Sequence, residues 1–252
     1  MLMAGCLSLV MNTACFKQLE MEEVTPPIQL EVEQNMAGKW YVFSRDAQPV
    51  PTNEKHVVTY EAGWKSYRSQ SHEGLSQNWM SKSGFSCTVY GSEITEKAGS
   101  LEYKSSVITI SPTEMQADVV EKDGAQSSSH RFVLRKDDAD YSQGVVGLWE
   151  GKFEKAGLPT ADDHRWEFRA NGTYVYYNRD TVNDVWVANP DLSADYLVDG
   201  KWLAMRRVDP LQGEIRECWD ISIEKERMYW IALREDSVKG RFNEQKELSK
   251  VK

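Results

Sequence analysis

Short segments in which apolar and polar residues alternate, separated by turn residues at close spacing, run through most of the chain. Asn171-Gly172 lies between two such segments, and Asp199-Gly200 lies between two more. Asn-Gly and Asp-Gly favour tight hairpins, because the two central residues of such a turn need a positive φ. No long stretch follows the period of an amphipathic helix. The chain is therefore predicted to be all-β, built from antiparallel strands that are neighbours in sequence.

The second half of the chain shows this plan most clearly. Hairpins are predicted within residues 166–177, 195–205 and 217–233. With an opening strand at Gly147 and a short strand around Trp186, they give roughly seven or eight strands. A sheet of that size closes or folds onto itself, because open edges invite aggregation. Consecutive hairpins favour closure into an up-and-down barrel.

The first half repeats the plan, and both halves open with a Gly-x-Trp motif. Gly38 and Trp40 open the first half, as Gly147 and Trp149 open the second. A polar stretch without apolar periodicity separates the two halves and is typical of a linker. The predicted fold class is two tandem antiparallel up-and-down β-barrels.

The N-terminus is interpreted as a targeting signal. Residues 1–14 are mostly apolar. They are too few for a membrane-spanning helix, which needs about 20 apolar residues, and are typical of a signal peptide. Cys15 follows small residues and resembles the lipidated cysteine of bacterial lipoproteins. Cys6 is a second candidate if more apolar sequence precedes Met1, and a locally packed apolar N-terminus is the alternative to lipidation.

These patterns give a complete domain plan. A signal peptide ending in the lipidated Cys15 is followed by a tether rich in Pro and Glu, which would lift the first domain off a membrane. The predicted segments are the signal peptide (1–15), the tether (16–35), the first barrel (36–136), a linker (137–144), the second barrel (145–236) and a charged tail (237–252).

The two barrels resemble lipocalins and their calycin relatives. Gly-x-Trp at the start of a β-barrel is the N-terminal signature of that family, and the second half adds the order F-x-x-N-G-T-Y, D-G-K and E-x-W-x-I. The resemblance implies that each opening tryptophan closes one barrel end beneath a basic side chain from the last strand. By position this would be Arg131 or Arg135 in the first half. The implied closing residues otherwise are Gly38, Trp40, Gly147, Trp149 and Arg234.

Composition argues against several functions. The formal net charge is −9, with no Lys/Arg run, which disfavours nucleic acid as a partner. The histidines are not at metal-ligand spacing with another His or Cys, so neither a metal nor a cofactor is expected. No nucleophile elbow, P-loop or dinucleotide motif is present, so we expect no enzyme activity. Cys87 and Cys218 are expected to be buried thiols, with a disulfide between the halves as the alternative.

The expected role is binding. Alternation places pairs of apolar residues on one face of three strands of the second barrel, where they would contact a small hydrophobic or flat ligand. These residues are Trp166, Phe168, Tyr174, Tyr176, Leu203 and Met205. The alternative is that they simply fill the barrel, and that loop aromatics such as Trp64, Trp79 and Trp186 bind a protein or glycan.

Both alternatives describe a non-catalytic binding lipoprotein of the bacterial cell envelope. Its partner would be a small hydrophobic ligand or another envelope component. The lipid anchor would be its only membrane contact, at the outer membrane, on the periplasmic or the surface face.

Overall fold

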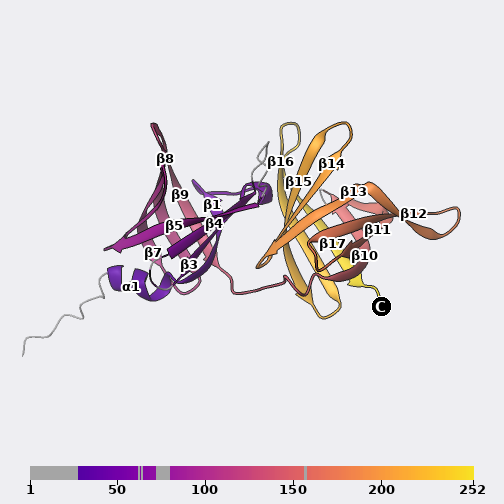
Figure 1. The fold of residues 1–252 in the computed structure, drawn as a ribbon, viewed down its shortest axis with the longest axis horizontal. Helices are drawn as coiled ribbons and strands as arrows, with labels where there is room; N and C mark the ends of the chain where they lie inside the picture. Colours follow the sequence, from indigo (N-terminus) through magenta and orange to yellow (C-terminus); the bar gives the residue numbers. More distant parts are fainter. Residues whose placement is uncertain (1–27, 62, 64, 72–79, 156–157) are drawn as a thin grey trace, which may run out of the picture.

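The computed structural model describes residues 28–61, 63, 65–71, 80–155 and 158–252. Cys6 and Cys15, with the expected signal peptide, lie outside these residues, as do Trp64 and Trp79. Figure 1 shows two barrels side by side, joined by a single connecting segment. Nearly all of the described chain is antiparallel β-structure in two closed barrels, which confirms the predicted fold class. In this part of the chain, no helix is long and apolar enough to cross a bilayer.

Barrel 1 is closed by eight of the described strands in sequence order, since β9 returns to pair with β1. The short β2 adds to the edge of β1. The barrel strands are β1 (Gly38–Arg45), β3 (His56–Glu61), β4 (Lys65–Ser71), β5 (Met80–Tyr90), β6 (Glu93–Ala98), β7 (Leu101–Ile110), β8 (Glu114–Asp123) and β9 (Gln126–Lys136), with α1 (Ile28–Asn35), β2 (Gln48–Pro49) and the 3-10 helix η1 (Thr52–Glu54) beside them.

Helix α1 changes the expected extent of the tether. Val32 of this helix is fully buried in the same core as Trp40, and α1 contacts β5 and β7. Residues 28–35 therefore belong to barrel 1 and not to a tether. The alternation that predicts strands carries no signal for this short helix, because its stability comes from packing against the barrel.

Barrel 2 is closed by β17, which pairs with β16 on one side and with β10 on the other. The hairpins β11–β12, β13–β14 and β15–β16 are those predicted. The strands are β10 (Gly147–Lys155), β11 (Leu158–Phe168), β12 (Thr173–Asp180), β13 (Val185–Asp199), β14 (Trp202–Asp209), β15 (Gly213–Glu224), β16 (Arg227–Asp236) and β17 (Gly240–Lys250).

The predicted charged tail at 237–252 is wrong, because most of it is β17. Alternate residues of this strand pair with inward-facing positions of β16, and Glu244 and Lys246 are among them. Two charged residues on the inner face hide the apolar alternation by which strands are recognised. This strand both closes the barrel and supplies charged side chains to its interior.

The closed ends of the two barrels have the same construction. Trp40 and Trp149 are each 0% exposed, and each indole N–H donates to the backbone oxygen of the residue four positions earlier, at 2.7 Å. The Nζ atoms of Lys136 and Lys250 lie 5.2 and 5.1 Å from the respective ring centroids. This geometry is a cation–π contact over a buried ring.

The resemblance therefore implied the wrong basic residues for closing the barrel ends. Arg234 lies over Trp219, 4.4 Å from its centroid, and not over Trp149. Arg131 and Arg135 form ion pairs on the exposed surface of barrel 1. The last strand of each barrel runs further than the sequence suggested, so Lys136 and Lys250 at the ends of β9 and β17 take the closing position.

The two opening glycines are required by this closure. Gly38 and Gly147 have φ of 127° and 136°, a region that side chains rarely adopt. A Cβ atom at either position would also lie within 3 Å of the covering lysine side chain. The Gly-x-Trp motif thus brings backbone, ring and lysine together at each barrel end.

The barrels contact each other through buried apolar side chains and ion pairs. Lys39, Lys55 and Lys201 pair with carboxylates of the opposite barrel or the connecting segment. The apolar contact consists of Tyr41, Val57, Trp202, Ala204 and Cys218. In Figure 1, barrel 1 faces the β15 and β16 side of barrel 2.

Helix η1 of barrel 1 completes the wall of barrel 2. Pairing between β15 and β16 extends no further than Asp220 and Ile231. Beyond that point the Cys218 N–H donates to Asn53 Oδ1 at 3.0 Å, and the Leu233 N–H donates to Thr52 Oγ1 at 2.9 Å. Side chains of barrel 1 thus satisfy backbone groups at a split in the barrel 2 sheet.

Candidate functional site

The interior of barrel 1 is filled. A space inside the described part of this barrel, bordered by Tyr60, Arg68 and Tyr103, measures about 30 Å³, roughly the share of one water molecule. Glu96 is fully buried there and pairs with Arg68. Ser66 Oγ donates to this carboxylate at 2.6 Å and Tyr60 Oη at 3.2 Å. A buried ion pair with satisfied hydrogen bonds thus takes up part of the interior of barrel 1.

The interior of barrel 2 is open. It contains a cavity of about 280 Å³, lined by Phe153, His164, Trp166, Tyr174, Tyr176, Leu192, Met205, Arg207, Glu217, Glu244 and Lys246. These residues come from β10 to β17 and combine aromatic rings with charged groups. The two barrels therefore share a closed end but differ in what they contain.

Stacked aromatic residues form the apolar part of this interior. Trp230 lies at the centre, with ring centroids of Trp166, Trp219 and Phe168 at 5.2, 5.5 and 5.8 Å. Such tilted and edge-to-face contacts are favourable for aromatic pairs. Trp219 and Trp230 are both fully buried. This cluster fixes a rigid apolar wall between the closed end and the cavity.

The structure divides the predicted ligand-binding residues into two groups. Trp166, Tyr174, Tyr176 and Met205 line the cavity. Phe168 and Leu203 are 1% and 0% exposed and belong to the packed core nearer Trp149. Strand alternation identifies the inner face correctly, but it does not show how far up the barrel the packing extends.

Lys246 is one of several residues of this site that the sequence analysis missed. Its Nζ lies 4.1 Å from the ring centroid of Trp219, 4.7 Å from that of Trp230 and 4.9 Å from that of Trp166. Burial lowers the pKa of this ammonium to about 8, against the opposing effect of Glu217 and the smaller one of Glu244. Lys246 was missed because residues 237–252 were predicted to be a charged tail. The alternation of inward-facing positions at 242, 244, 246 and 248 was the sequence pattern that could have revealed a strand.

Arg234 and Glu244 form a second charged group in the wall. Arg234 Nε donates to Glu244 Oε2 at 2.9 Å, and Nη1 donates to the Cys218 carbonyl oxygen at 3.0 Å. Nη1 also donates to Asn53 Oδ1 of barrel 1. Arg234 thus takes part both in the contact between the barrels and in the charged side of the cavity.

Tyr174 stays protonated in this environment. Burial, and then the nearby Glu217 carboxylate, raise the pKa of its phenol above the ordinary value. Its hydroxyl is therefore available as a neutral hydrogen-bonding group across the physiological pH range.

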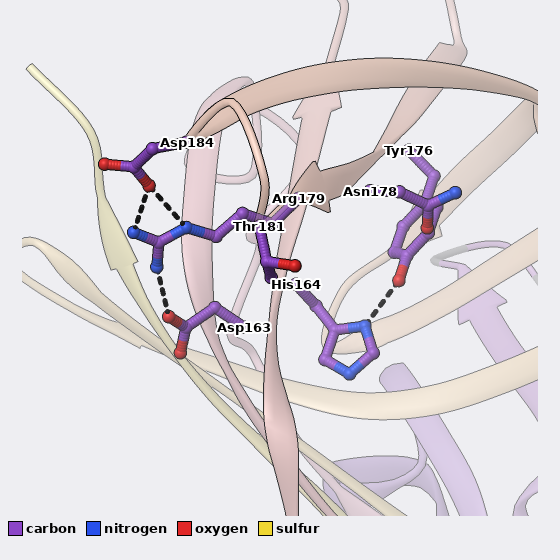
Figure 2. A pocket seen from close by; sticks show the side chains of 7 residues that line it. All are labelled: Asp163, His164, Tyr176, Asn178, Arg179, Thr181 and Asp184. Atoms are coloured by element: carbon purple, nitrogen blue, oxygen red, sulfur yellow. Dashed lines mark hydrogen bonds and ion pairs between the residues drawn. The ribbon is translucent and has the colours of Figure 1, made fainter.

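A polar hollow of about 560 Å³ adjoins the cavity, as Figure 2 shows. His164 and Tyr176 line both spaces, and His164 Nδ1 lies 2.5 Å from the Tyr176 hydroxyl. Arg179 bridges Asp163 and Asp184, at 3.0 and 2.7 Å. The ion-paired side chains hold the β12–β13 hairpin against β11 at the mouth.

The described residues show no metal site. They contain no cluster of three or more His, Cys, Asp and Glu side chains suited to a metal ion. Cys87 and Cys218 are buried in different clusters, and the disulfide considered between the halves is not formed. Burial raises the pKa of Cys87 to about 12, which makes its thiolate scarce.

Trp186 lies in a hollow on the outer face of barrel 2. The Arg165 guanidinium carbon lies 4.3 Å from its ring centroid, and the hollow measures about 570 Å³. Leu148, Glu167 and Tyr177 also line it. This surface is separate from the cavity inside the barrel.

Comparison with protein-family models finds no match, and a search of curated proteins finds none either. Among solved structures, the chain is similar to a protein of the DUF3598 family from Nostoc punctiforme, described as of unknown function. The identity is 11% and the TM-score 0.28, over 88% of this chain and 99% of the other. Function is therefore argued from the residues of the site.

Proposed function

We propose that the protein is a non-catalytic binding protein of the bacterial cell envelope whose second barrel holds a small flat or hydrophobic ligand. The observation that carries this proposal is the cavity of about 280 Å³ against the tryptophan cluster of barrel 2. Ligand sites are typically concave and largely apolar, with a few placed polar groups. Barrel 1, with its filled interior, would serve as a structural partner that braces the wall of barrel 2.

The proposal includes a relation to lipocalins and a lipid anchor. The repeated closure of Gly, Trp and Lys at both barrel ends supports the relation. The apolar N-terminus followed by Cys15 supports an anchor that places the barrels at the membrane surface. The net charge of −9 disfavours nucleic acid as a partner.

Calorimetric titration with flat and aliphatic amphiphiles tests the binding role. At least one flat probe is expected to bind, and Leu192→Trp, which enlarges a cavity-lining side chain, is expected to weaken it at least about tenfold. Leu197→Trp is the matched control, because Leu197 is 41% exposed outside the cavity. Absence of binding across the panel would remove the proposed function.

Metabolic labelling with a fatty acid in a Gram-negative host tests the anchor. The chain is expected to incorporate label and to enter the membrane fraction, and Cys15→Ser is expected to abolish both. Cys6→Ser is the matched control and is expected to retain the label. The reverse pattern would place the anchor at Cys6, and no label in the unaltered chain would exclude lipidation in that host.

The outer hollow of barrel 2 supports a second candidate function, binding of a glycan or protein on the surface. The observation that favours it is the stacking of Arg165 on the partly exposed Trp186. A glycan array probed with the full chain and with Trp186→Ala tests it. Binding that is lost in Trp186→Ala but retained in Leu192→Trp would favour the surface over the cavity.

A further inference from the structure

The interior of barrel 2 contains more hydrogen-bond donors than its acceptors satisfy. Among the described residues, Lys246 has no hydrogen bond or ion pair, although its ammonium lies within about 5 Å of several ring centroids. The indole N–H groups of Trp219 and Trp230, and Nη2 of Arg234, are buried there without an acceptor. Buried donors are normally paired, and each unpaired one is costly.

The other cations around Lys246 already have carboxylate partners. Its neighbours are Glu217 on β15, Glu244 on its own strand β17 and Arg234 on β16. Arg234 already engages Glu244, so that carboxylate is shared. Arg207 on β14 and His164 on β11 complete the titratable lining, together with Tyr174 and Tyr176 of β12. Arg207 Nη1 pairs with Asp209 at 3.5 Å, so among the lysine and arginine side chains that line the described cavity, Lys246 is the one without an ion pair.

We propose that the cavity takes a ligand that has a flat apolar body and a single anionic group of the carboxylate class. The anionic group would contact the Lys246 ammonium, and the flat body would lie against Trp166 and the tryptophan cluster behind it. This inference rests on the proposed function, because it names the ligand class of the same cavity. It also explains why a lysine is kept over aromatic rings at a stability cost.

Three probes with the same ring system separate charge from shape. They are 2-naphthoate, the neutral 2-naphthamide and the cationic naphthalen-2-ylmethylammonium. Calorimetry with the full chain at pH 7 is expected to rank naphthoate tightest, at least about tenfold over the amide, since hydrogen bonds to charged groups are the stronger ones. The cation is expected to bind weakest.

Two variants test which residues cause the preference for naphthoate over the amide. Lys246→Met is expected to abolish the preference for naphthoate over the amide while amide binding persists. Glu217→Gln removes the carboxylate that raises the Lys246 pKa, so in this variant the fall of naphthoate affinity with pH is expected to begin at a lower pH. Lys152→Met is the matched control, because Lys152 is exposed and its position in β10 lies on the outer face. It is expected to leave all three affinities unchanged.

The pH dependence gives an independent readout. An anion on Lys246 raises the pKa of the ammonium above about 8 in the complex, so naphthoate affinity is expected to fall as pH rises above 8. Amide affinity is expected to stay level, and Lys246→Met is expected to remove the fall.

The outcomes distinguish the inference from the proposed function. Equal binding of naphthoate and amide, or tightest binding of the cation, would overturn the anionic ligand and leave the binding cavity intact. A preference that survives in Lys246→Met would also overturn it. Failure of all three probes to bind would overturn the cavity and the anionic ligand together.

Discussion

At the residue scale, Lys246 opposes the stability of the barrel that contains it. Its side chain is partly buried, with the ammonium over aromatic rings, and desolvation there lowers its pKa to about 8. A depressed lysine pKa means that folding disfavours the charged form. The destabilisation is therefore fully present below pH 8 and fades as pH rises toward the ordinary lysine value of about 10.5.

Replacing this lysine is expected to stabilise the fold. Lys246→Met should raise the free energy of unfolding by about 1–2 kcal/mol at pH 7, with a smaller gain near pH 10. Urea denaturation of both proteins at the two pH values measures it. A loss of stability at pH 7 would show that the ammonium is well solvated or paired in the protein.

The glycine of the second Gly-x-Trp motif allows a matched comparison. Gly147→Ala is expected to cost roughly 2–4 kcal/mol, because it combines an unfavourable φ with contact against Lys250. Gly240→Ala also has a positive φ but open space around it, and should cost only about 1 kcal/mol. Equal losses in thermal denaturation would mean that the close approach of Lys250 contributes nothing.

At the element scale, the strands predictable from sequence are those with an apolar inner face. The turns at Asn171-Gly172 and Asp199-Gly200 join the hairpins expected of them. Strand β17 is harder to recognise, because Glu244 and Lys246 face inward where apolar residues are the rule. The same two residues define the charged side of the cavity, so the sequence signal failed at the candidate site itself.

Helix η1 is a second element that local sequence does not reveal. Its hydrogen bonds join residues about 165 to 181 positions apart, so no local pattern encodes them. Thr52 is fully buried, and its hydroxyl accepts from a strand N–H of the other barrel. Removing one partner of such a bond leaves a buried donor unsatisfied.

Hydrogen exchange tests this contact. Thr52→Val keeps the side-chain shape but removes the acceptor, so the Leu233 amide is expected to exchange at least about tenfold faster, for a loss of about 1–2 kcal/mol. Thr88→Val, at an exposed position of β5, is the control and should leave that amide unchanged. Unchanged exchange at Leu233 in Thr52→Val would argue against η1 as part of the wall.

At the scale of the whole molecule, the same barrel architecture occurs twice, with different interiors. Both barrels close with a glycine, a buried tryptophan and a lysine. The repeated Gly-x-Trp motif predicted the glycine and the tryptophan but not the lysine. Their interiors differ, since the Arg68–Glu96 pair is buried inside barrel 1 and barrel 2 contains a cavity. Whether a barrel holds a cavity depends on side chains from many strands. This is why the sequence predicted two barrels and candidate ligand-binding residues in the second, but left open whether those residues fill it.

A crystal structure of the full chain with 6-bromo-2-naphthoate tests the central claim most directly, because the bromine can be located by its anomalous scattering. We expect a single bromine peak per chain inside barrel 2, beside Trp166, with the carboxylate toward Lys246 and no peak inside barrel 1. A bromine peak inside barrel 1, or peaks confined to the outer surface of either barrel, would contradict the account.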